Sequence, residues 1–355
     1  MDPDGVSLVK TSTTPLTSHP ASFIFTTSTT AMTAPSTKPM RKRMEEYVLS
    51  LQDEIVGAFE KLDPNAPPFK RDTWLRSEGG SGRSCVFGVP PSYTGAEAQN
   101  TILEKGGVNV SVVHGMLPPP AIKQMRADHS SIPDIQKSVP FFAAGISLVI
   151  HPRNPHAPTV HANYRYFEIT EPPEEEGKQG KVVAWWFGGA CDPHGAAVYP
   201  TFKKWCDEYF YITHRSESRG IGGVFFDDLS DEPHKRFEPG AARPKTQEEI
   251  FAFIKDVGNA FVPSYIPILA RRAHTPSDEH ARRWQLLRRG RYVEFNLVYD
   301  RGTKFGLMTP GARVESILMS LPETARWEYM SELGSDPDTE EGKLMSVLRN
   351  PKDWI

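Results

Sequence analysis

The chain has 355 residues, of which 38% are hydrophobic and 10% aromatic, enough to bury the core of one large domain or of two ordinary ones. Its 41 basic and 44 acidic residues leave a net charge of -3, which excludes the strong positive field of a protein that binds nucleic acid or an anionic membrane. The sequence contains no run of about eighteen apolar residues, so no membrane-spanning helix is predicted. Its three cysteines form no CxxC pair, which favours a reducing compartment over a disulfide or zinc framework.

The first 38 residues are rich in Ser, Thr and Pro, and we expect them to form a disordered tail. Residues 5–38 carry no acidic side chain, as transit peptides do, so a mitochondrial targeting segment is the alternative interpretation. Asp2, Asp4 and the lack of arginine before Arg41 fit an Arg-rich presequence poorly. Residues 39–355 are expected to form one folded domain.

Two amphipathic helices are predicted, one at the start of this domain and one in its C-terminal half. Apolar residues three and four positions apart between Met44 and Leu62 predict a helix that ends before Pro64. Thr246 and Glu249 have the spacing of a capping box, and the apolar spacing beyond them predicts a second helix, which Pro263 ends or kinks.

Six apolar, β-branched or aromatic runs have the character of strands: 108–115, 145–152, 160–169, 182–189, 223–229 and 291–302. The acidic, Pro-containing stretch 170–181 is typical of a hairpin connection, so the strands on either side of it are expected to pair antiparallel. No βαβ spacing repeats along the chain. The predicted fold class is therefore α+β, a single domain built on an antiparallel sheet.

The strand 160–169 is predicted to carry a polar face. Because side chains alternate along a strand, His161, Asn163 and Arg165 share one side, whereas Tyr164 points to the other. An imidazole, an amide and a guanidinium in line could move protons, orient a ligand and clamp a carboxylate. A solvated sheet face is the alternative. Asp192 and Asp300 lie near ends of predicted strands, and Asp300 would share its side with Glu294 and Asn296.

A metal site is an alternative that the sequence supports less well. His151, His156 and His161 are five residues apart, so the middle one would point away from the others in an extended chain, and the prolines between them forbid a helix. Asp227 and Asp228 could bind a divalent cation or cap a turn that ends a strand. We interpret the basic stretch 281–292 as a solvated helix end that leads into a strand, and the glycine-rich stretch 77–84 as a flexible turn.

Several long stretches resemble the oxygen-dependent coproporphyrinogen-III oxidase family: VNVSVVHG (108–115), HPRNPHAPTVHANYRYFE (151–168), WWFGGACD (185–192), YPTFKKWCDEYFYITHRSESRGIGGVFFDDL (199–229), FVPSYIPI (261–268) and the segment 288–329. The similarity extends from about residue 40 to the C-terminal NPKDWI. It implies a homodimer in which a large antiparallel sheet is sandwiched between α-helices. It also implies an oxidoreductase of haem biosynthesis that needs no metal or organic cofactor. Such an enzyme uses molecular oxygen to convert two propionates of coproporphyrinogen III to vinyl groups, giving protoporphyrinogen IX.

The resemblance also implies roles for individual residues. His161 matches the proton donor of the family, and His151 and His214 match further histidines. Residues 292–328 match the region of the dimer contact. The positions that match substrate-binding residues are Ser147, Asn163, Tyr164, Arg165, Gly311, Ala312 and Arg313. We hypothesise that Asp192 or Asp300 removes a pyrrole N–H proton, that the ring then reduces oxygen, and that His161 manages protons.

The sequence departs from the family after Asp192, which is followed directly by PHGAAVYPTFKKWCD. The family has a Leu-Thr-Pro turn and a helix there, so more than about twenty residues are missing, enough to impair folding or activity. An omitted exon in a gene prediction or a shortened isoform would explain the gap. A catalytically weakened porphyrinogen-binding homologue and a metal-dependent oxygenase are the alternative functions. We expect a cytoplasmic location, with the mitochondrial intermembrane space as the alternative, because the family occurs in both.

Overall fold

The computed structural model describes residues 37–77, 79–126, 129, 132–175, 179–191, 198–308 and 312–354, with backbone only for Cys191 and Phe305. The residues from Lys38 onward form one compact unit. The predicted tail lies outside the described residues except for its last two positions, and Asp192 and Gly311 lie outside them as well.

A seven-stranded antiparallel sheet is the centre of this unit, and its strands follow the order β1-β2-β3-β4-β5-β6-β9. Their bounds are β1 Lys70–Leu75, β2 Gly80–Gly88, β3 Leu103–Leu117, β4 Val139–Pro152, β5 Val160–Thr170, β6 Val182–Cys191 and β9 Val224–Leu229. The predicted antiparallel sheet and the predicted pairing of β5 with β6 are confirmed. Two short strands, β7 (Tyr211–Ile212) and β8 (Glu217–Ser218), pair apart from this sheet.

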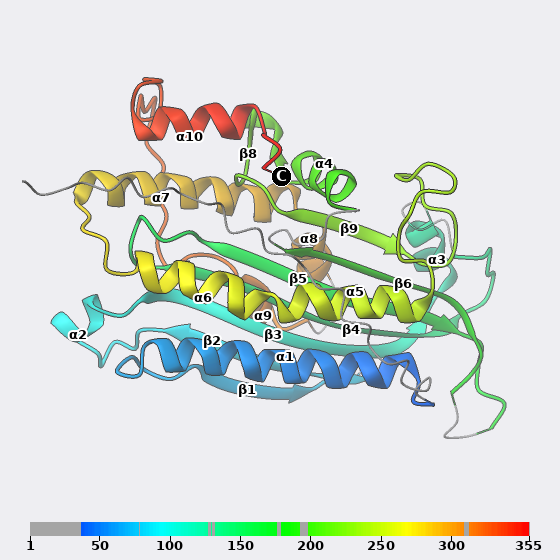
Figure 1. Ribbon diagram of the computed structural model, residues 1–355. Coiled ribbons are helices and arrows are strands. Elements are labelled where there is room, and N and C mark those ends of the chain that lie inside the picture. Colours follow the sequence, from blue (N-terminus) through cyan, green and yellow to red (C-terminus); the bar gives the residue numbers. More distant parts are fainter. Residues whose placement is uncertain are drawn as a thin grey trace, which may run out of the picture. The chain divides into compact units, whose positions relative to one another are not determined.

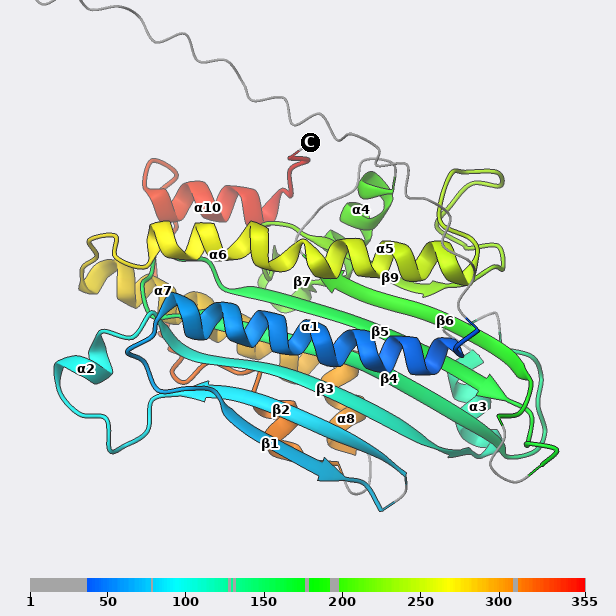
Figure 2. The same cartoon turned by 60° about the horizontal axis from the view of Figure 1, so that its bottom comes forward.

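One face of the sheet is apolar and is covered by three helices, α1 (Met40–Leu62), α5 (Gln247–Asn259) and α6 (Phe261–Arg272), as Figures 1 and 2 show. The predicted first helix is confirmed and starts one turn earlier. The capping box of α5 is also confirmed, since Thr246 Oγ1 accepts from the amide of Glu249 and Glu249 accepts from the amide of Thr246. The residues that α1 covers on β3 and β4 include Val108, Val110, Ile146 and Leu148, all buried in one core. Their burial drives the packing of this layer.

The remaining helices lie around the other face and the far edge of the sheet: α4 Tyr199–Tyr209, α7 Glu279–Glu294, α8 Arg301–Met308, α9 Val314–Leu318 and α10 Glu340–Arg349. Helix α4 packs along the edge strand β9, and α9 lies over β2 and β3, where Ser316 accepts a hydrogen bond from Asn109. Two short helices, α2 (Ala96–Gln99) and α3 (Pro119–Arg126), and the 3-10 turn η1 (Thr213–Arg215) lie in connections.

The prediction of a strand over 291–302 is wrong. Helix α7 continues to Glu294, a π-helical turn η2 (Phe295–Tyr299) follows, and α8 starts at Arg301. The side-chain alternation that grouped Asp300 with Glu294 and Asn296 therefore does not apply. Part of the glycine-rich stretch 77–84 also differs from its prediction, because β2 begins at Gly80.

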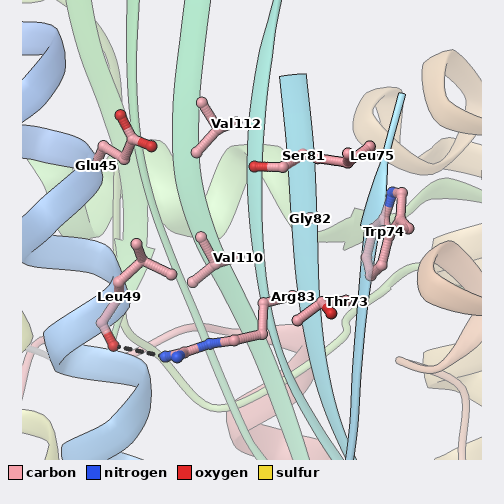
Figure 3. A pocket seen from close by; sticks show the side chains of 10 residues that line it. All are labelled: Glu45, Leu49, Thr73, Trp74, Leu75, Ser81, Gly82, Arg83, Val110 and Val112. Atoms are coloured by element: carbon pink, nitrogen blue, oxygen red, sulfur yellow. Dashed lines mark hydrogen bonds between the residues drawn. The ribbon is translucent and has the colours of Figure 1, made fainter. Parts of the chain in front are cut away.

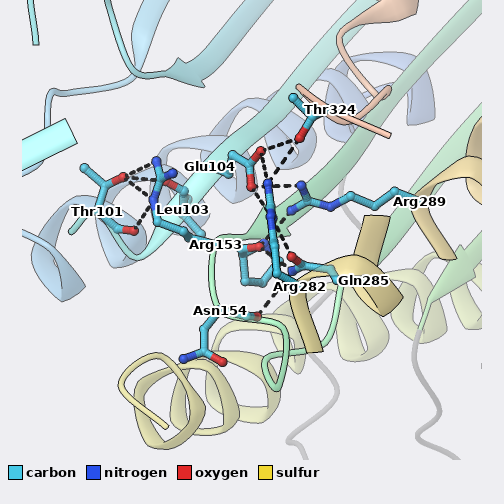
Figure 4. Close-up of polar contacts among 10 residues, drawn as sticks. Thr101, Leu103, Glu104, Arg153, Asn154, Arg282, Gln285, Arg289 and Thr324 are labelled. Atoms are coloured by element: carbon cyan, nitrogen blue, oxygen red, sulfur yellow. Dashed lines mark hydrogen bonds and ion pairs between the residues drawn. The ribbon is translucent and has the colours of Figure 1, made fainter. Parts of the chain in front are cut away.

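A buried ionic cluster fastens α7 to the start of β3 (Figure 4). Glu104 accepts hydrogen bonds from Arg282 and Arg289, at 2.8 Å each for the closest oxygen, and from Thr324. Burial disfavours the ionised carboxylate, but the two guanidiniums outweigh it and lower the pKa of Glu104 to about 2. This cluster holds the helix that leads directly into Asp300.

A cavity of about 320 Å³ lies between α1 and the edge of the sheet formed by β1 and β2, on the apolar side (Figure 3). Its lining includes Glu45, Leu49 and Arg83, and the Arg83 guanidinium donates to the Leu49 carbonyl at 2.9 Å. Val110 and Val112 form its floor from the side that faces α1. The cavity therefore opens away from the face that carries His161.

Candidate active site

A row of polar side chains crosses five strands on the face opposite α1. The register pairs Asp72 with Ser84, Ser84 with Asn109, Asn109 with Ser147, and Ser147 with Asn163. Directly paired residues point to the same side of an antiparallel sheet, so the row consists of Asp72, Ser84, Asn109, Ser147 and Asn163. We call it the polar row. Two predicted substrate-binding residues, Ser147 and Asn163, are neighbours within it.

The row of residues next to the polar row, on the same face, carries large side chains near its two ends, Arg165 and Trp74, and only small side chains between them. It runs through Gly188, Arg165, Gly145, Ser111, Gly82 and Trp74. A Cβ atom on Gly82 would lie 2.0 Å from the ring of Trp74, and one on Gly188 would lie 2.8 Å from Nε of Arg165. Glycine is therefore required for these two side chains to lie flat on the sheet. Between them, Gly145 and Ser111 form a low floor, and Ser111 is exposed.

His161 is half-buried at the side of the polar row. Its Nδ1 lies 3.1 Å from the carbonyl of Leu148, and since a carbonyl only accepts, this nitrogen carries the proton. Burial, together with the nearby Arg219, lowers the pKa of His161 to about 4, although Asp300 favours the protonated ring. The imidazole is thus neutral near pH 7, with a lone pair on Nε2.

Arg219, which sequence reasoning missed, lies beside His161. Its guanidinium carbon is 4.0 Å from the ring centre of Phe210 and within 5.2 Å of those of Tyr292 and Phe295. Within the described residues, no carboxylate or hydrogen-bond acceptor pairs with this half-buried guanidinium. A cation held by aromatic rings without an anion is suited to receive an anionic ligand. Arg219 is the first residue of the RGIGG stretch (219–223), whose glycines are typical of a turn, but no local pattern marks this arginine as part of a site.

Arg165 is the second cation at this end of the face. Its Nη2 lies 2.9 Å from Oδ2 of Asp227, its Nη1 donates to Asn163 at 3.2 Å, and 40% of its side chain stays exposed. Burial opposes ionisation of Asp227, but Arg165, His129 and Arg301 outweigh it, so that the pKa of Asp227 is lowered. The sequence allowed Asp227 to be a cation ligand or a turn cap, but its main partner in the structure is the guanidinium of Arg165.

Asp300 and Arg301 reach the same place from the turn between η2 and α8. Asp300 Oδ1 accepts from the hydroxyl of Tyr209 at 3.2 Å, and Oδ2 accepts from the amide of Thr303 at 2.6 Å. Arg301 lies 3.8 Å from Asp227 and over the ring of Tyr209. The predicted residues His161, Asn163, Arg165 and Asp300 are therefore brought together, although Asp300 arrives on a helical turn and not on a strand.

Arg313 lies at the far end of the floor. It forms an ion pair with Asp72 and packs over the ring of Trp74, with 4.8 Å between the guanidinium carbon and the ring centre. Ala312 precedes it and is partly exposed. Arg165 on β5 and Trp74 on β1 are four strands apart, about 19 Å at the usual strand spacing. The predicted binding residues thus form two groups at opposite ends of one surface.

Three predicted residues lie elsewhere. Tyr164 is 1% exposed on the apolar face, where its hydroxyl donates to the carbonyl of Val257, so its side chain does not reach the polar row. His151 is buried, and its Nε2 lies 2.8 Å from the Ser320 carbonyl. His214 is on the surface and pairs with Glu294 at 2.6 Å.

Across the described ranges, no three His, Cys, Asp or Glu side chains are grouped so as to hold a metal ion. His156 lies in a turn, with its amide bonded to Asn154. Nor does any helix in the described part of the chain have the length and apolar character to cross a membrane.

The arrangement combines guanidiniums at two ends of a low floor, a neutral histidine and aromatic walls. The class it defines is an α+β protein with an open sheet face for a ligand that carries several carboxylates. Comparison with known proteins identifies the particular family: the family model described as "Coproporphyrinogen III oxidase" matches residues 43–192 and 190–354. The chain belongs to the coproporphyrinogen III oxidase family.

Three relatives illustrate the similarity. The oxygen-dependent coproporphyrinogen-III oxidase of Drosophila melanogaster is 49% identical over 89% of this chain and 78% of its own length. The mitochondrial enzyme of Homo sapiens is 46% identical over 89% and 67%, and the chloroplastic enzyme of Glycine max is 44% identical over 91% and 81%. The family match breaks at residues 190–192, the point where the sequence departs from the family pattern.

Proposed function

We propose that this chain uses molecular oxygen to decarboxylate two propionates of coproporphyrinogen III oxidatively, giving protoporphyrinogen IX in haem biosynthesis. The observation that carries the proposal is the neutral imidazole of His161 near two guanidiniums, those of Arg165 and Arg219, at the end of an open floor. A substrate with four propionates needs several fixed cations, and an electron-rich macrocycle needs aromatic walls and little water.

Binding comes first in this proposal. Arg165 and Arg219 hold the carboxylate of the reacting propionate, and Arg313 holds one at the far end of the floor. Arg313 is already paired with Asp72, and Arg165 with Asp227, so both guanidiniums are oriented before the ligand arrives. Such preorganisation reduces the entropy lost on binding and brings the reacting carbon close to His161.

Proton transfer is the second part. Because Nδ1 of His161 donates to the Leu148 carbonyl, Nε2 is the atom that accepts a proton and later returns it. To act as the proton donor that the family assigns to this position, the neutral His161 first accepts a proton at Nε2. Asp300, fixed by Tyr209 and the amide of Thr303, is positioned to take a pyrrole N–H proton. Asp192 remains the other candidate for that step.

The reaction balances without a further oxidant. Each propionate loses its carboxyl group as carbon dioxide, and the electron pair of the broken C–C bond forms the vinyl double bond. The β-carbon gives up a hydrogen with two electrons, and molecular oxygen accepts these and one proton to become hydrogen peroxide. We propose that the macrocycle itself delivers the electrons, with no metal or organic cofactor, so activity should survive treatment with a chelator.

A catalytically weakened porphyrinogen-binding protein is the second candidate, and the break of the family match at residues 190–192 favours it. The missing segment would have lain next to β6, near Gly188 and Arg165 in the sheet. Binding without turnover, with turnover restored when the family segment is inserted after Asp192, would identify this second function.

We also propose a homodimer. Several apolar side chains are exposed on the stretch that the resemblance assigns to the dimer contact: Leu297, Val298, Leu307, Met308, Val314 and Trp327. Exposed apolar groups of this extent on one segment are typical of an interface with another chain. Sedimentation equilibrium should give twice the chain mass, and Met308→Asp should shift the population toward monomer.

Location is proposed on family grounds. The relatives from rat, mouse and human are named mitochondrial, and those from soybean and tobacco chloroplastic. We propose the mitochondrial intermembrane space, with the cytosol as the alternative. Fractionation of cells that express the full chain distinguishes the two.

The experiment that tests the function uses chelator-treated protein and coproporphyrinogen III prepared without oxygen. On admission of oxygen, oxygen uptake and hydrogen peroxide should rise with protoporphyrin fluorescence after the product autoxidises, two oxygen molecules for each macrocycle. Turnover that requires added iron or copper would contradict the cofactor-free proposal. A folded protein that binds the substrate but consumes no oxygen would support the second candidate.

A further inference from the structure

His129 reaches the functional face from the connection after α3. Its imidazole stacks on the indole of Trp186, with 4.3 Å between ring centres and 25° between planes. Its Nδ1 lies 3.2 Å from Oδ1 of Asp228, and 15% of each of the two side chains is exposed. The ring is therefore held on one flat side and at one nitrogen, and it is largely covered. Neither the predicted site nor the proposed mechanism uses it.

Asp228 has an unusual backbone that connects it to the propionate clamp. Its φ angle is +56°, in the left-handed region that non-glycine residues occupy at a cost. In this conformation its amide donates to Oδ1 of Asp227 at 3.0 Å, while Oδ2 of Asp227 lies 2.9 Å from Arg165. The strained residue thus orients the carboxylate that fixes the arginine.

A continuous chain of contacts results: His129 to Asp228, the Asp228 amide to Asp227, and Asp227 to Arg165. From the other side, Nε2 of His234 lies 3.0 Å from the carbonyl of Asp227. The contact with His129 is one side-chain anchor of Asp228, and a hydrogen bond to an ionised carboxylate helps to offset the backbone strain. Loss of this contact weakens the hold on the Asp228 side chain, so that the strained backbone can relax and turn the Asp228 amide away from Asp227 more readily.

We propose that His129 is a positioning residue for the carboxylate clamp: it holds Asp228 in its strained conformation and thereby fixes Asp227 and Arg165 for the propionate. This inference rests on the proposed function, because it takes Arg165 to bind a propionate. His129 does not touch the reacting atoms. Its loss should weaken binding of the substrate and leave the chemical step largely intact.

Two variants separate the two contacts of the ring. His129→Asn keeps an N–H donor close to the place of Nδ1 but loses the stacking, and His129→Phe keeps an aromatic ring on Trp186 but loses the donor. We expect His129→Phe to raise KM for coproporphyrinogen III about fivefold with kcat nearly unchanged, the lower end of typical coupling between groups. His129→Asn should retain a KM near that of the unmodified protein. His280→Phe is the matched control, since His280 pairs with Glu341 on the surface.

Coupling to Arg165 gives a second test. In an Arg165→Lys background, His129→Phe should change the dissociation constant for coproporphyrin III, the oxidised form of the substrate, by less than twofold, because the arginine on which it acts is gone. An undiminished effect in that background would overturn the proposal. So would equal KM increases in both His129 variants, which would assign the role to stacking, or a wild-type KM in His129→Phe.

Hydrogen exchange at the Asp228 amide keeps the inference testable if the protein has no turnover. His129→Phe should speed exchange of this amide severalfold and His129→Asn should not. Faster exchange in the absence of any oxidase activity would refute the proposed function but not the contact chain. Unchanged exchange with normal turnover would refute the chain alone. Thermal unfolding of each variant checks that it is folded.

Discussion

The two faces of the central sheet are built from the same strands and differ in almost every physical respect. On one face, Leu148 and Tyr164 are buried at 0% and 1% exposure under α1 and α5. On the other, their chain neighbours Ser147 and Arg165 stay partly exposed among polar groups. Because side chains alternate along a strand, adjacent residues point one to the buried face, which stabilises the fold, and the other to the face that carries the candidate site. Substitutions at adjacent positions should give opposite kinds of defect.

The largest effect is expected at His161. His161→Asn keeps a donor for the Leu148 carbonyl but removes the Nε2 lone pair, so kcat should fall about 10²- to 10⁴-fold, as for loss of a general acid-base group. The free energy of unfolding should change little. Steady-state kinetics and urea denaturation of the same preparation measure both.

Tyr164→Phe, on the same strand, is the matched control for the other face. It removes the hydrogen bond to Val257 and should lower the free energy of unfolding by about 1 kcal/mol without changing kcat. A loss of turnover in Tyr164→Phe that equals the loss in His161→Asn would contradict the division between the faces.

The next largest effect concerns the ionic cluster that holds α7 over the functional side. Glu104→Gln leaves Arg282 and Arg289 without their buried carboxylate, so the free energy of unfolding should fall by about 3–5 kcal/mol. Urea denaturation measures the change. Glu46→Gln, which breaks an exposed pair with Lys38, should change it by less than about 1 kcal/mol. Equal effects of the two substitutions would show that burial of the cluster does not matter.

Adjacent residues on β4 compare the faces most closely. Leu148→Ala creates a cavity under α1 and should lower the free energy of unfolding by about 2–5 kcal/mol while leaving KM unchanged. Ser147→Ala should do the reverse, raising KM with a stability change within about 0.5 kcal/mol. A reversed outcome, in which Ser147→Ala unfolds the protein and Leu148→Ala affects only KM, would contradict the assignment of the two faces.

The smallest effect is a pH dependence of stability that comes from two histidines, His151 and His161. Burial lowers the pKa of His151 to about 3 and that of His161 to about 4, whereas both titrate near 6.5 in the unfolded chain. The unfolded state therefore binds more protons between pH 6.5 and about 4. The free energy of unfolding is highest above pH 6.5 and should fall as the pH is lowered through this window.

Denaturation between pH 7 and pH 5 measures this slope before most carboxylates titrate. His151→Gln removes one of the two groups and should make the slope shallower. A free energy of unfolding that stays constant over this range would contradict the neutral, buried state of both histidines.

Much of the fold could be predicted because alternation and helical spacing are local signals. The strand 160–169 and the side on which His161 and Arg165 lie followed from alternation alone. The same alternation predicted a strand over 291–302, because the aromatic and β-branched residues of this run suit a strand. In the structure, Phe295 instead packs against Phe210 and Arg219 from a π-helical turn. Packing against distant residues overrode local preference there.

Arg219 and Asp227 were missed as parts of the site for a related reason. Asp227 becomes the partner of Arg165 only because β9 pairs with β6, and β6 with β5. No local pattern specifies that pairing across more than sixty residues of chain. Among the residues that the structure describes, no acidic side chain pairs with Arg219, and this too is a property of the tertiary fold that no local pattern predicts.

An anaerobic crystal structure with coproporphyrinogen III tests most directly whether the polar face is the substrate site. We predict that the macrocycle lies over Gly145 and Ser111, with carboxylates at Arg165 and Arg313 and one propionate within hydrogen-bond distance of His161. A macrocycle bound in the cavity between α1 and the sheet, against Glu45 and Arg83, would contradict the assignment of function to the polar face.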